Sequence, residues 1–409
     1  MSSAGGHDFD NDDDTGDAIT QHISETVSGL RISAIKEMAM RSAQVPGAAS
    51  LAWGLPSFRT PEHIRSAVHA ALDSDPDIGK YALPDGLPRL RELVAQRHLE
   101  QTGIAVDPNR HVMITAGNMQ GLNALFHTLL NPGDEVIVTD PGFASHLPQI
   151  RLCGGVPVAW AMDEDVGWAL DMAALPELIT KRTRAVVLVS PSNPTGKIFL
   201  ERQLRALGEL ARAKDFVVLI DDPYSHFTYE NQANYFNLAR VAELTDRLVY
   251  LFTFSKAYAM SGWRLGYIVL PEALKREVLK VHDATIICTP RISQVAGIAA
   301  LSQEPIHLAR FEQVLGERRA QICARLDRVP HVFSYVKPEG AYYVFPRILV
   351  AHEDSVQFSL DLLQHTKVTV TPGGAFGRRG EHHVRMAYCV SEEVIDTAFD
   401  RIERHFADG

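Results

Sequence analysis

Short apolar stretches alternate with helical stretches through the middle of the chain, and this alternation constrains the fold most. Seven apolar stretches have the length and composition of strands: 112–115, 135–139, 156–161, 185–190, 216–220, 248–252 and 266–270. Several are rich in Val and Ile, as is typical of strands covered on both faces. Between them, apolar residues recur at helical spacing, for example over 117–130. The pattern predicts an α/β fold with a mostly parallel seven-stranded sheet and helices on both faces.

The pattern changes after about residue 290. Long helical stretches over 302–328 and 391–406 bracket short strand candidates such as 341–345, 368–370 and 384–388, which predicts a smaller α+β domain. The expected organisation has four parts: a disordered acidic tail (1–18), an N-terminal segment with one amphipathic helix that packs with the small domain (19–50), a large domain (51–290) and a small C-terminal domain (291–409).

Composition narrows the class of protein. The net charge is −10, but six aspartates in the first 18 residues exaggerate it, and the mildly acidic remainder gives no support for a nucleic-acid partner. The four cysteines lie far apart, which favours a reducing, cytoplasmic compartment. The N-terminus lacks a signal-peptide pattern, and no uninterrupted apolar stretch of about 18 residues is present, so we expect no membrane partner.

In open α/β sheets, ligands bind beyond the carboxyl ends of the strands. Polar and aromatic residues follow five of the predicted strands: Gly117 and Asn118; Phe143; Asn193; Asp221 and Tyr224; Thr253, Ser255, Lys256 and Arg264. A helix that starts at Gly117–Asn118 offers free N–H groups to a phosphate, and hydroxyls and an arginine would complete the cradle.

The remaining side chains suit pyridoxal phosphate. A desolvated lysine has a pKa below its usual value of about 10.4, which would make Lys256 a competent imine former. Asp221 would keep a pyridine nitrogen protonated, and Phe143 could stack on the ring. Taken singly, each residue also has an ordinary structural interpretation, such as a surface lysine, a turn-forming aspartate or a core phenylalanine. The hypothesis depends on all of them lying at the strand ends of one sheet. The histidines lack metal-type spacing, so we assign no metal.

At these residues the sequence resembles the class I/II aminotransferases, pyridoxal-phosphate enzymes of fold type I (the aspartate aminotransferase fold). The most specific match is Ser255–Lys256 followed by 259–267. Further matches occur in the family's order: Tyr81 with Gly86; 115–118; 141–143; 192–196; Asp221 with Tyr224; 338–340; 371–373; and Val384–Arg385. The resemblance covers nearly the whole chain after about residue 25.

The resemblance implies roles for these residues. Lys256 would form the Schiff base and move the proton, Asp221 would pair with the pyridine nitrogen, Asn193 and Tyr224 would bond the phenolic oxygen, and Phe143 would stack on the ring. The phosphate would be held by Gly117, Asn118, Thr253, Ser255, Arg264 and, from a second subunit, Tyr81. The substrate would be held by Arg385 at its α-carboxylate, by the Gly54 backbone and by Asn193. A homodimer with shared active sites is therefore implied.

The implied function is transfer of an amino group from an amino acid to a 2-oxo acid. Met119 lies where some relatives with acidic substrates carry a lysine, and Leu30 is apolar, so neutral or apolar donors are favoured. Arg31 or Arg291 could instead meet a side-chain carboxylate. A lyase, synthase or oxidase would use the same lysine and electron sink, so this alternative stays open. Regulators on this fold carry an added DNA-binding domain, for which the N-terminal segment is too short and too acidic.

Overall fold

The computed structural model describes residues 20–30 and 32–407. The predicted acidic tail (1–18) and Arg31 lie outside these ranges. Residues 20–30 form the short helices η1 (Thr20–His22) and α1 (Glu25–Ser28). Ser24 caps α1 by accepting a hydrogen bond from the Val27 N–H. Residues 32–407 belong to a separate compact unit, which is described below.

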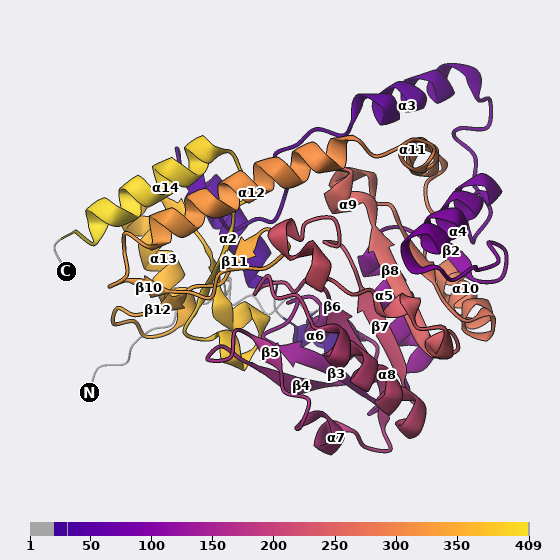
Figure 1. The fold of residues 1–409 in the computed structure, drawn as a ribbon, viewed down its shortest axis with the longest axis horizontal. Helices are drawn as coiled ribbons and strands as arrows, with labels where there is room; N and C mark the ends of the chain where they lie inside the picture. Colours follow the sequence, from indigo (N-terminus) through magenta and orange to yellow (C-terminus); the bar gives the residue numbers. More distant parts are fainter. Residues whose placement is uncertain (1–19, 31, 408–409) are drawn as a thin grey trace. The chain divides into compact units, whose positions relative to one another are not determined.

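A central sheet forms the large part of this unit (Figure 1). Its strand order is β2 (Val112–Thr115), β9 (Gly266–Val269), β8 (Leu248–Thr253), β7 (Val217–Asp221), β6 (Thr183–Val189), β3 (Glu135–Asp140), β4 (Val156–Asp163) and β5 (Ala169–Leu170). Strands β8 to β4 pair in parallel, and β9 is antiparallel to both of its neighbours. The seven predicted strands and the mostly parallel sheet are confirmed. The sheet has an eighth strand, β5, which is only two residues long and therefore too short to give a sequence pattern.

Helices cover both faces of the sheet because its strands carry apolar side chains on both faces. On β6, Ala185 and Val187 pack in one apolar cluster with residues of α5 (Asn118–Leu129) and α10 (Glu272–Ile286). The intervening Val186 and Leu188 pack in another with residues of α4 (Pro88–Thr102) and α8 (Glu201–Lys214). Side chains alternate between the two faces of a strand, so a continuous apolar run places apolar groups on both. Further helices of this part are α3 (Glu62–Ser74), α6 (His146–Leu152), α7 (Leu175–Leu178), α9 (Phe254–Ala257) and α11 (Arg291–Leu301).

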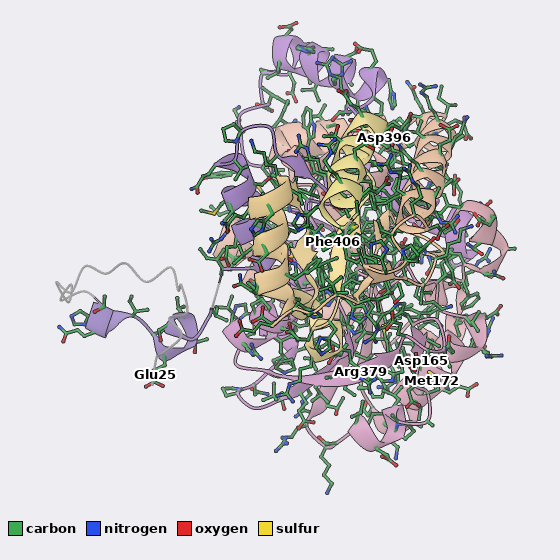
Figure 2. The ribbon with its side chains drawn as sticks, turned by 90° about the vertical axis from the view of Figure 1, so that its left-hand side faces the viewer. Glu25, Asp165, Met172, Arg379, Asp396 and Phe406 are labelled. Carbon is green, nitrogen blue, oxygen red and sulfur yellow. The ribbon has the colours of Figure 1, made fainter. Side chains whose placement is uncertain are left out.

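The predicted smaller α+β region is present in the C-terminal part of the chain. Its helices are α12 (His307–Leu326), α13 (Ser355–Thr366) and α14 (Glu392–His405), and its strands are β10 (Phe333–Ser334), β11 (Tyr343–Val344), β12 (Arg347–Ile348), β13 (Val368–Thr369), β14 (Thr371–Pro372) and β15 (Val384–Ala387). Helix α12 was predicted to begin at 302 but begins at His307, because Pro305 disfavours helical geometry in the residue before it. Arg325 on α12 pairs with acidic residues of α14, among them Asp396. Figure 2 labels Asp396 on this helix.

The predicted amphipathic helix near the N-terminus is α2 (Ala34–Ala43). Its Met38 is buried, and Ser42 Oγ accepts a hydrogen bond from Thr369 Oγ1 of β13 at 2.8 Å. The next element, β1 (Ala49–Ser50), pairs in parallel with β13. This N-terminal stretch thus packs on the C-terminal strands, while the predicted domain boundaries remain predictions. None of the described helices is long and apolar enough to cross a membrane.

Candidate active site

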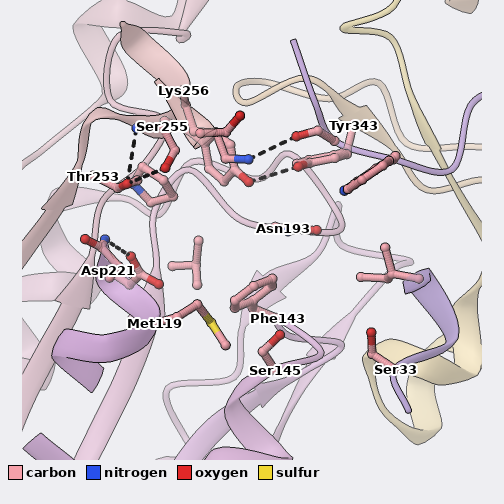
Figure 3. Close-up of a pocket in the computed structure, with 18 of the residues that line it drawn as sticks. Ser33, Met119, Phe143, Ser145, Asn193, Asp221, Thr253, Ser255, Lys256 and Tyr343 are labelled. Carbon is pink, nitrogen blue, oxygen red and sulfur yellow. Dashed lines mark hydrogen bonds between the residues drawn. The ribbon is translucent and has the colours of Figure 1, made fainter. Parts of the chain in front are cut away.

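A pocket opens at the carboxyl ends of the central strands, and residues from distant parts of the chain line it (Figure 3). The predicted site residues that line it are Gly54, Asn118, Phe143, Asn193, Asp221, Tyr224, Thr253, Ser255, Lys256, Arg264 and Arg385. Two predicted residues do not. Gly117 lies just behind the wall, and Tyr81 is 76% exposed. The parallel sheet explains the gathering, because its strand ends meet at one edge.

Lys256 lies in α9, directly after β8, and its Nζ donates a hydrogen bond to the Gly54 carbonyl oxygen at 3.0 Å. Burial lowers the pKa of this amine to about 8, and the nearby positive charges of Arg385 and Arg264 act in the same direction. The lysine is therefore a much better nucleophile near neutral pH than a surface lysine.

Asp221 ends β7 and is almost fully buried. Its Oδ1 accepts a hydrogen bond from Asn118 Nδ2 at 2.6 Å, and Oδ2 lies 3.7 Å from Nε2 of the buried His146. The side chain of Asn118 thus bonds the carboxylate, because the first residue of α5 reaches the end of β7, while the phosphate role of Asn118 stays a prediction. Asn118 of α5 therefore holds Asp221 by a hydrogen bond, and His146 of α6 lies beside it.

The phosphate end of the pocket combines hydroxyls, a glycine and an arginine. Thr253 Oγ1 donates to Ser255 Oγ at 2.8 Å and accepts from the Ser255 N–H. Gly117 has φ +77°, and a Cβ there would lie 2.5 Å from Arg264 Nη2. Only glycine therefore lets this guanidinium approach the N-terminus of α5. The set provides donors and positive charge for a phosphate.

Arg385 on β15 is a buried cation without a buried anion beside it. It is 2% exposed, and its guanidinium donates to Asn193 Oδ1 at 3.2 Å and to the Ala52 carbonyl oxygen at 2.6 Å. Among the described residues, no carboxylate lies within ion-pair distance, and Nε has no hydrogen-bond partner. An unpaired buried charge is costly, so this arrangement fits an anionic ligand.

Several pocket residues were missed by sequence reasoning. Tyr343 of β11 shares a hydrogen bond with Tyr224 (hydroxyl oxygens 3.0 Å apart) and stacks on Arg385, with the guanidinium carbon 4.5 Å from the ring centre. The signals that could have found it are its place in the predicted strand 341–345 and just after the matched 338–340 motif. Val189, Pro223 and Ser261 also line the pocket, and five further residues form its outer wall: Ser33, Ile35, Lys36, Trp53 and Ser145. No motif marks them, since they meet the pocket only through tertiary packing.

The family model for aminotransferase class I and II matches residues 49–402. The chain belongs to this family. It is 35% identical over 384 residues to an aspartate aminotransferase of Pyrococcus horikoshii, covering 93% of this chain and 96% of the relative. It is 32% identical to aromatic-amino-acid aminotransferase 2 of Thermococcus litoralis, with 93% and 97% covered. A solved structure of Thermus thermophilus aspartate aminotransferase with maleate is 32% identical, with a TM-score of 0.88 and 93% and 99% of the two chains covered.

The protein is therefore a pyridoxal-phosphate-dependent aminotransferase that acts on an amino acid and a 2-oxo acid. The observed residues fit this cofactor. The buried Lys256 has a lowered pKa, Asp221 is held without a cationic lysine or arginine partner among the described residues, and the hydroxyls of Thr253 and Ser255 lie near Arg264. These are the amine, the carboxylate and the phosphate donors that the cofactor requires.

Proposed function

We propose that this aminotransferase takes a neutral or apolar amino donor, and that Lys256, Asp221 and Arg385 divide the chemistry among them. When bound, pyridoxal phosphate supplies an aldehyde for amines and a ring that withdraws electrons from Cα. Lys256 would hold the cofactor at its aldehyde, and its amine is placed to take up and return the proton of the substrate Cα. Its burial and lowered pKa support both tasks.

The other cofactor residues act by position. Asp221, steadied by Asn118, would keep the ring nitrogen protonated, and Phe143 would pack on the ring. Asn193 and Tyr224 would donate to the phenolic oxygen, with Tyr343 orienting the Tyr224 hydroxyl. The phosphate would be held by Thr253, Ser255, Arg264 and the backbone at Gly117 and Asn118.

The observation that carries the substrate assignment is the unpaired buried guanidinium of Arg385. Its planar fork is suited to the α-carboxylate, which every α-amino acid and 2-oxo acid shares. The Gly54 backbone and Asn193 complete the clamp. The Gly54 backbone lies so close to Tyr343 that a Cβ at position 54 would overlap the Tyr343 ring.

The donor preference follows from the outer wall. Ile35 and Trp53 of the outer wall, together with Met119, line the pocket with apolar surface. Arg291, which could have met an acidic side chain, is engaged by Asp75 with the nitrogen and oxygen 3.2 Å apart. Leu30 belongs to the separately described N-terminal segment and gives no further support. The relatives include one named for aspartate, an acidic donor, and one named for aromatic amino acids, which are apolar donors.

A cytoplasmic homodimer with shared active sites completes the proposal. Tyr81, Leu83, Trp53 and Leu55 are large apolar side chains that are strongly exposed on the described chain. Such exposure supports a subunit contact through which Tyr81 would reach the partner's phosphate. All four cysteines are free thiols, which supports a reducing compartment.

The test is the half-reaction of the purified holoenzyme with single amino acids. We expect leucine or phenylalanine to convert the yellow form to the pyridoxamine form, and a 2-oxo acid to reverse the change. Arg385→Ala should weaken binding of the amino acid by about 2 to 5 kcal/mol, because a substrate charge loses its buried partner. If no amino acid supports the conversion, or if the variant binds as tightly as the parent, the proposal is wrong.

A further inference from the structure

A second cavity lies at the edge of the central sheet opposite to the active site. It is bounded by residues at the amino ends of β2 and β8 and at the carboxyl end of β9, which runs antiparallel to both. The active site uses the other ends of these strands, such as Thr253 at the end of β8. The second cavity has a volume of about 370 Å³, against about 250 Å³ for the active-site pocket, so it can hold a small molecule. The proposed function makes no use of it.

Most of the wall of this cavity is apolar. Aliphatic side chains from four separate segments line it: Ile104, Val106, Val241, Leu248, Val269 and Leu270. Two rings line it as well, those of His98 and Tyr250, with their centres 6.0 Å apart. An aromatic ring packs favourably against aliphatic groups and against the edges of other rings. The body of a matching ligand is therefore aromatic, and a few polar groups must orient it.

One buried polar atom of the wall is left without a partner. His98 of α4 is 4% exposed, and its Nδ1 has no hydrogen-bond partner among the described residues. Burial lowers the pKa of this ring to about 4, so His98 is neutral near pH 7 and can present Nδ1 as an acceptor. The Tyr250 hydroxyl is already used, because it donates to Asp222 at 2.8 Å. A buried polar atom without a partner is costly, and a ligand that donates to His98 removes that cost.

The exposed side of the cavity is acidic. Asp246 and Glu272 line it with side chains that are 68% and 35% exposed, whereas no lysine or arginine of residues 20–30 and 32–407 does. Arg247 lies 3.7 Å from Asp246 Oδ2, and Arg110 bonds Glu272 Oε2. The second oxygen of each carboxylate is left for a ligand. An amine gains a charge-assisted hydrogen bond on this side, whereas a carboxylate would be repelled.

We propose that this cavity is a second ligand site, which takes a small aromatic amine whose ring carries an N–H or O–H donor. The ring lies among the aliphatic side chains and donates to His98 Nδ1, and the amine faces Asp246 and Glu272. The site is separate from the pyridoxal-phosphate site, since the two pockets share no lining residue. It also differs in charge, because the active-site pocket contains the unpaired Arg385 and favours a carboxylate, whereas this cavity favours an amine.

The experiment titrates the holoenzyme by isothermal calorimetry with hordenine, a phenol that carries a dimethylaminoethyl group. Hordenine is a tertiary amine, so it cannot form an imine with the cofactor. Two matched probes each lack one feature: dimethylphenethylamine lacks the hydroxyl, and isopentylphenol, with carbon in place of nitrogen, lacks the charge. We expect hordenine to bind one site per chain with a Kd below about 1 mM, and each matched probe to bind at least about fivefold more weakly.

Variants test whether hordenine binds in this cavity. His98→Phe removes the acceptor and keeps a ring, so it should weaken hordenine at least about fivefold without weakening dimethylphenethylamine. His98→Asn keeps an acceptor near the position of Nδ1 and should bind hordenine more tightly than His98→Phe does. Ala105→Trp, at an exposed position of the wall, should block the cavity. His127→Phe, which changes an exposed histidine outside the cavity, is the matched control and should leave binding unchanged.

Three results would overturn the inference: hordenine does not bind the parent enzyme, both matched probes bind as tightly as hordenine, or Ala105→Trp binds it as tightly as the parent. Competition of hordenine with an amino acid in the half-reaction would also overturn it, because hordenine would then occupy the active-site pocket. The matched probes need only the parent enzyme, so they test the inference even if His98→Phe does not fold. Calorimetry does not require turnover, so a protein that transfers no amino group would refute the proposed function and leave this test intact.

Discussion

The two ends of the pocket are built differently. At the cofactor end, Asp221, Asn193 and Ser255 are at most 6% exposed and follow directly on buried strands. At the substrate end, Trp53 is 56% exposed and Met119 is 36% exposed, and α2 contributes residues from an element outside the central sheet. The sheet fixes the first end, whereas the packing of α2 and loops shapes the second. The chemistry at the cofactor and the choice of substrate therefore depend on separable parts of the molecule.

The strongest test of this separation is Lys256→Ala. We expect the transfer rate to fall by about 10⁴-fold for every amino acid alike, because a positioned proton carrier is lost from the cofactor end. Steady-state rates with leucine and glutamate measure this, and Lys181→Ala serves as the control. A loss of rate that differs strongly between leucine and glutamate would contradict the separation of the cofactor end from the substrate end.

A matched pair of aspartates separates chemistry from stability at the cofactor end. Asp221→Asn should lower the rate about 10² to 10³-fold, since a charge that acts in the reaction is removed. Asp222 is fully buried and accepts from Tyr235 and Tyr250 at 2.7 and 2.8 Å, and burial raises its pKa to about 6. Asp222→Asn should instead cost about 1–3 kcal/mol of unfolding free energy with a smaller loss of rate. Equal loss of rate in both variants would contradict these roles.

The buried amine of Lys256 predicts a pH dependence of the cofactor-free protein. Its pKa of about 8 lies below the unfolded value of about 10.4, so the unfolded state binds more protons between these pH values. Stability should therefore rise with pH across this window and be lowest below it. The rate of pyridoxal phosphate capture should rise roughly tenfold from pH 7 to pH 9, since only the neutral amine reacts. Urea unfolding and absorbance measure the two, and a flat capture rate would refute the lowered pKa.

The smallest expected effect concerns the substrate end. Met119→Lys adds a cation to the outer wall and should raise the ratio of glutamate to glutamine rates by about fivefold, with little change in cofactor absorbance. Met119→Leu is the control for volume. An unchanged or lower ratio in the lysine variant would show that Met119 does not face the substrate side chain.

The difference between the two ends also decides how much the sequence could predict. Lys256, Asp221 and Asn193 follow strands with clear apolar patterns, so their meeting at one sheet edge was predictable. The hydrogen bond from Asn118 to Asp221 was not, because it depends on where α5 begins relative to the end of β7. Lys36 belongs to a predicted helix, yet only its packing on distant C-terminal strands brings it to the pocket.

The strands of the large sheet were likewise predictable from local patterns, except the two-residue strand β5. β6 and β8 are continuous apolar runs, and both were predicted. β5 has two residues and exists through its pairing with β4 across a turn. β11 lies inside the predicted strand 341–345, but the contact of its Tyr343 with Arg385 depends on the pairing of β11 with the distant β15, which no sequence window shows.

The central claim is that one amine, Lys256, holds the cofactor. The direct measurement is reduction of the purified yellow protein with borohydride, followed by digestion and mass spectrometry of the labelled peptide. The account predicts a single label on the lysine that follows Ser255. A label on another lysine, such as Lys36, or no label on a protein that still transfers amino groups, would contradict it.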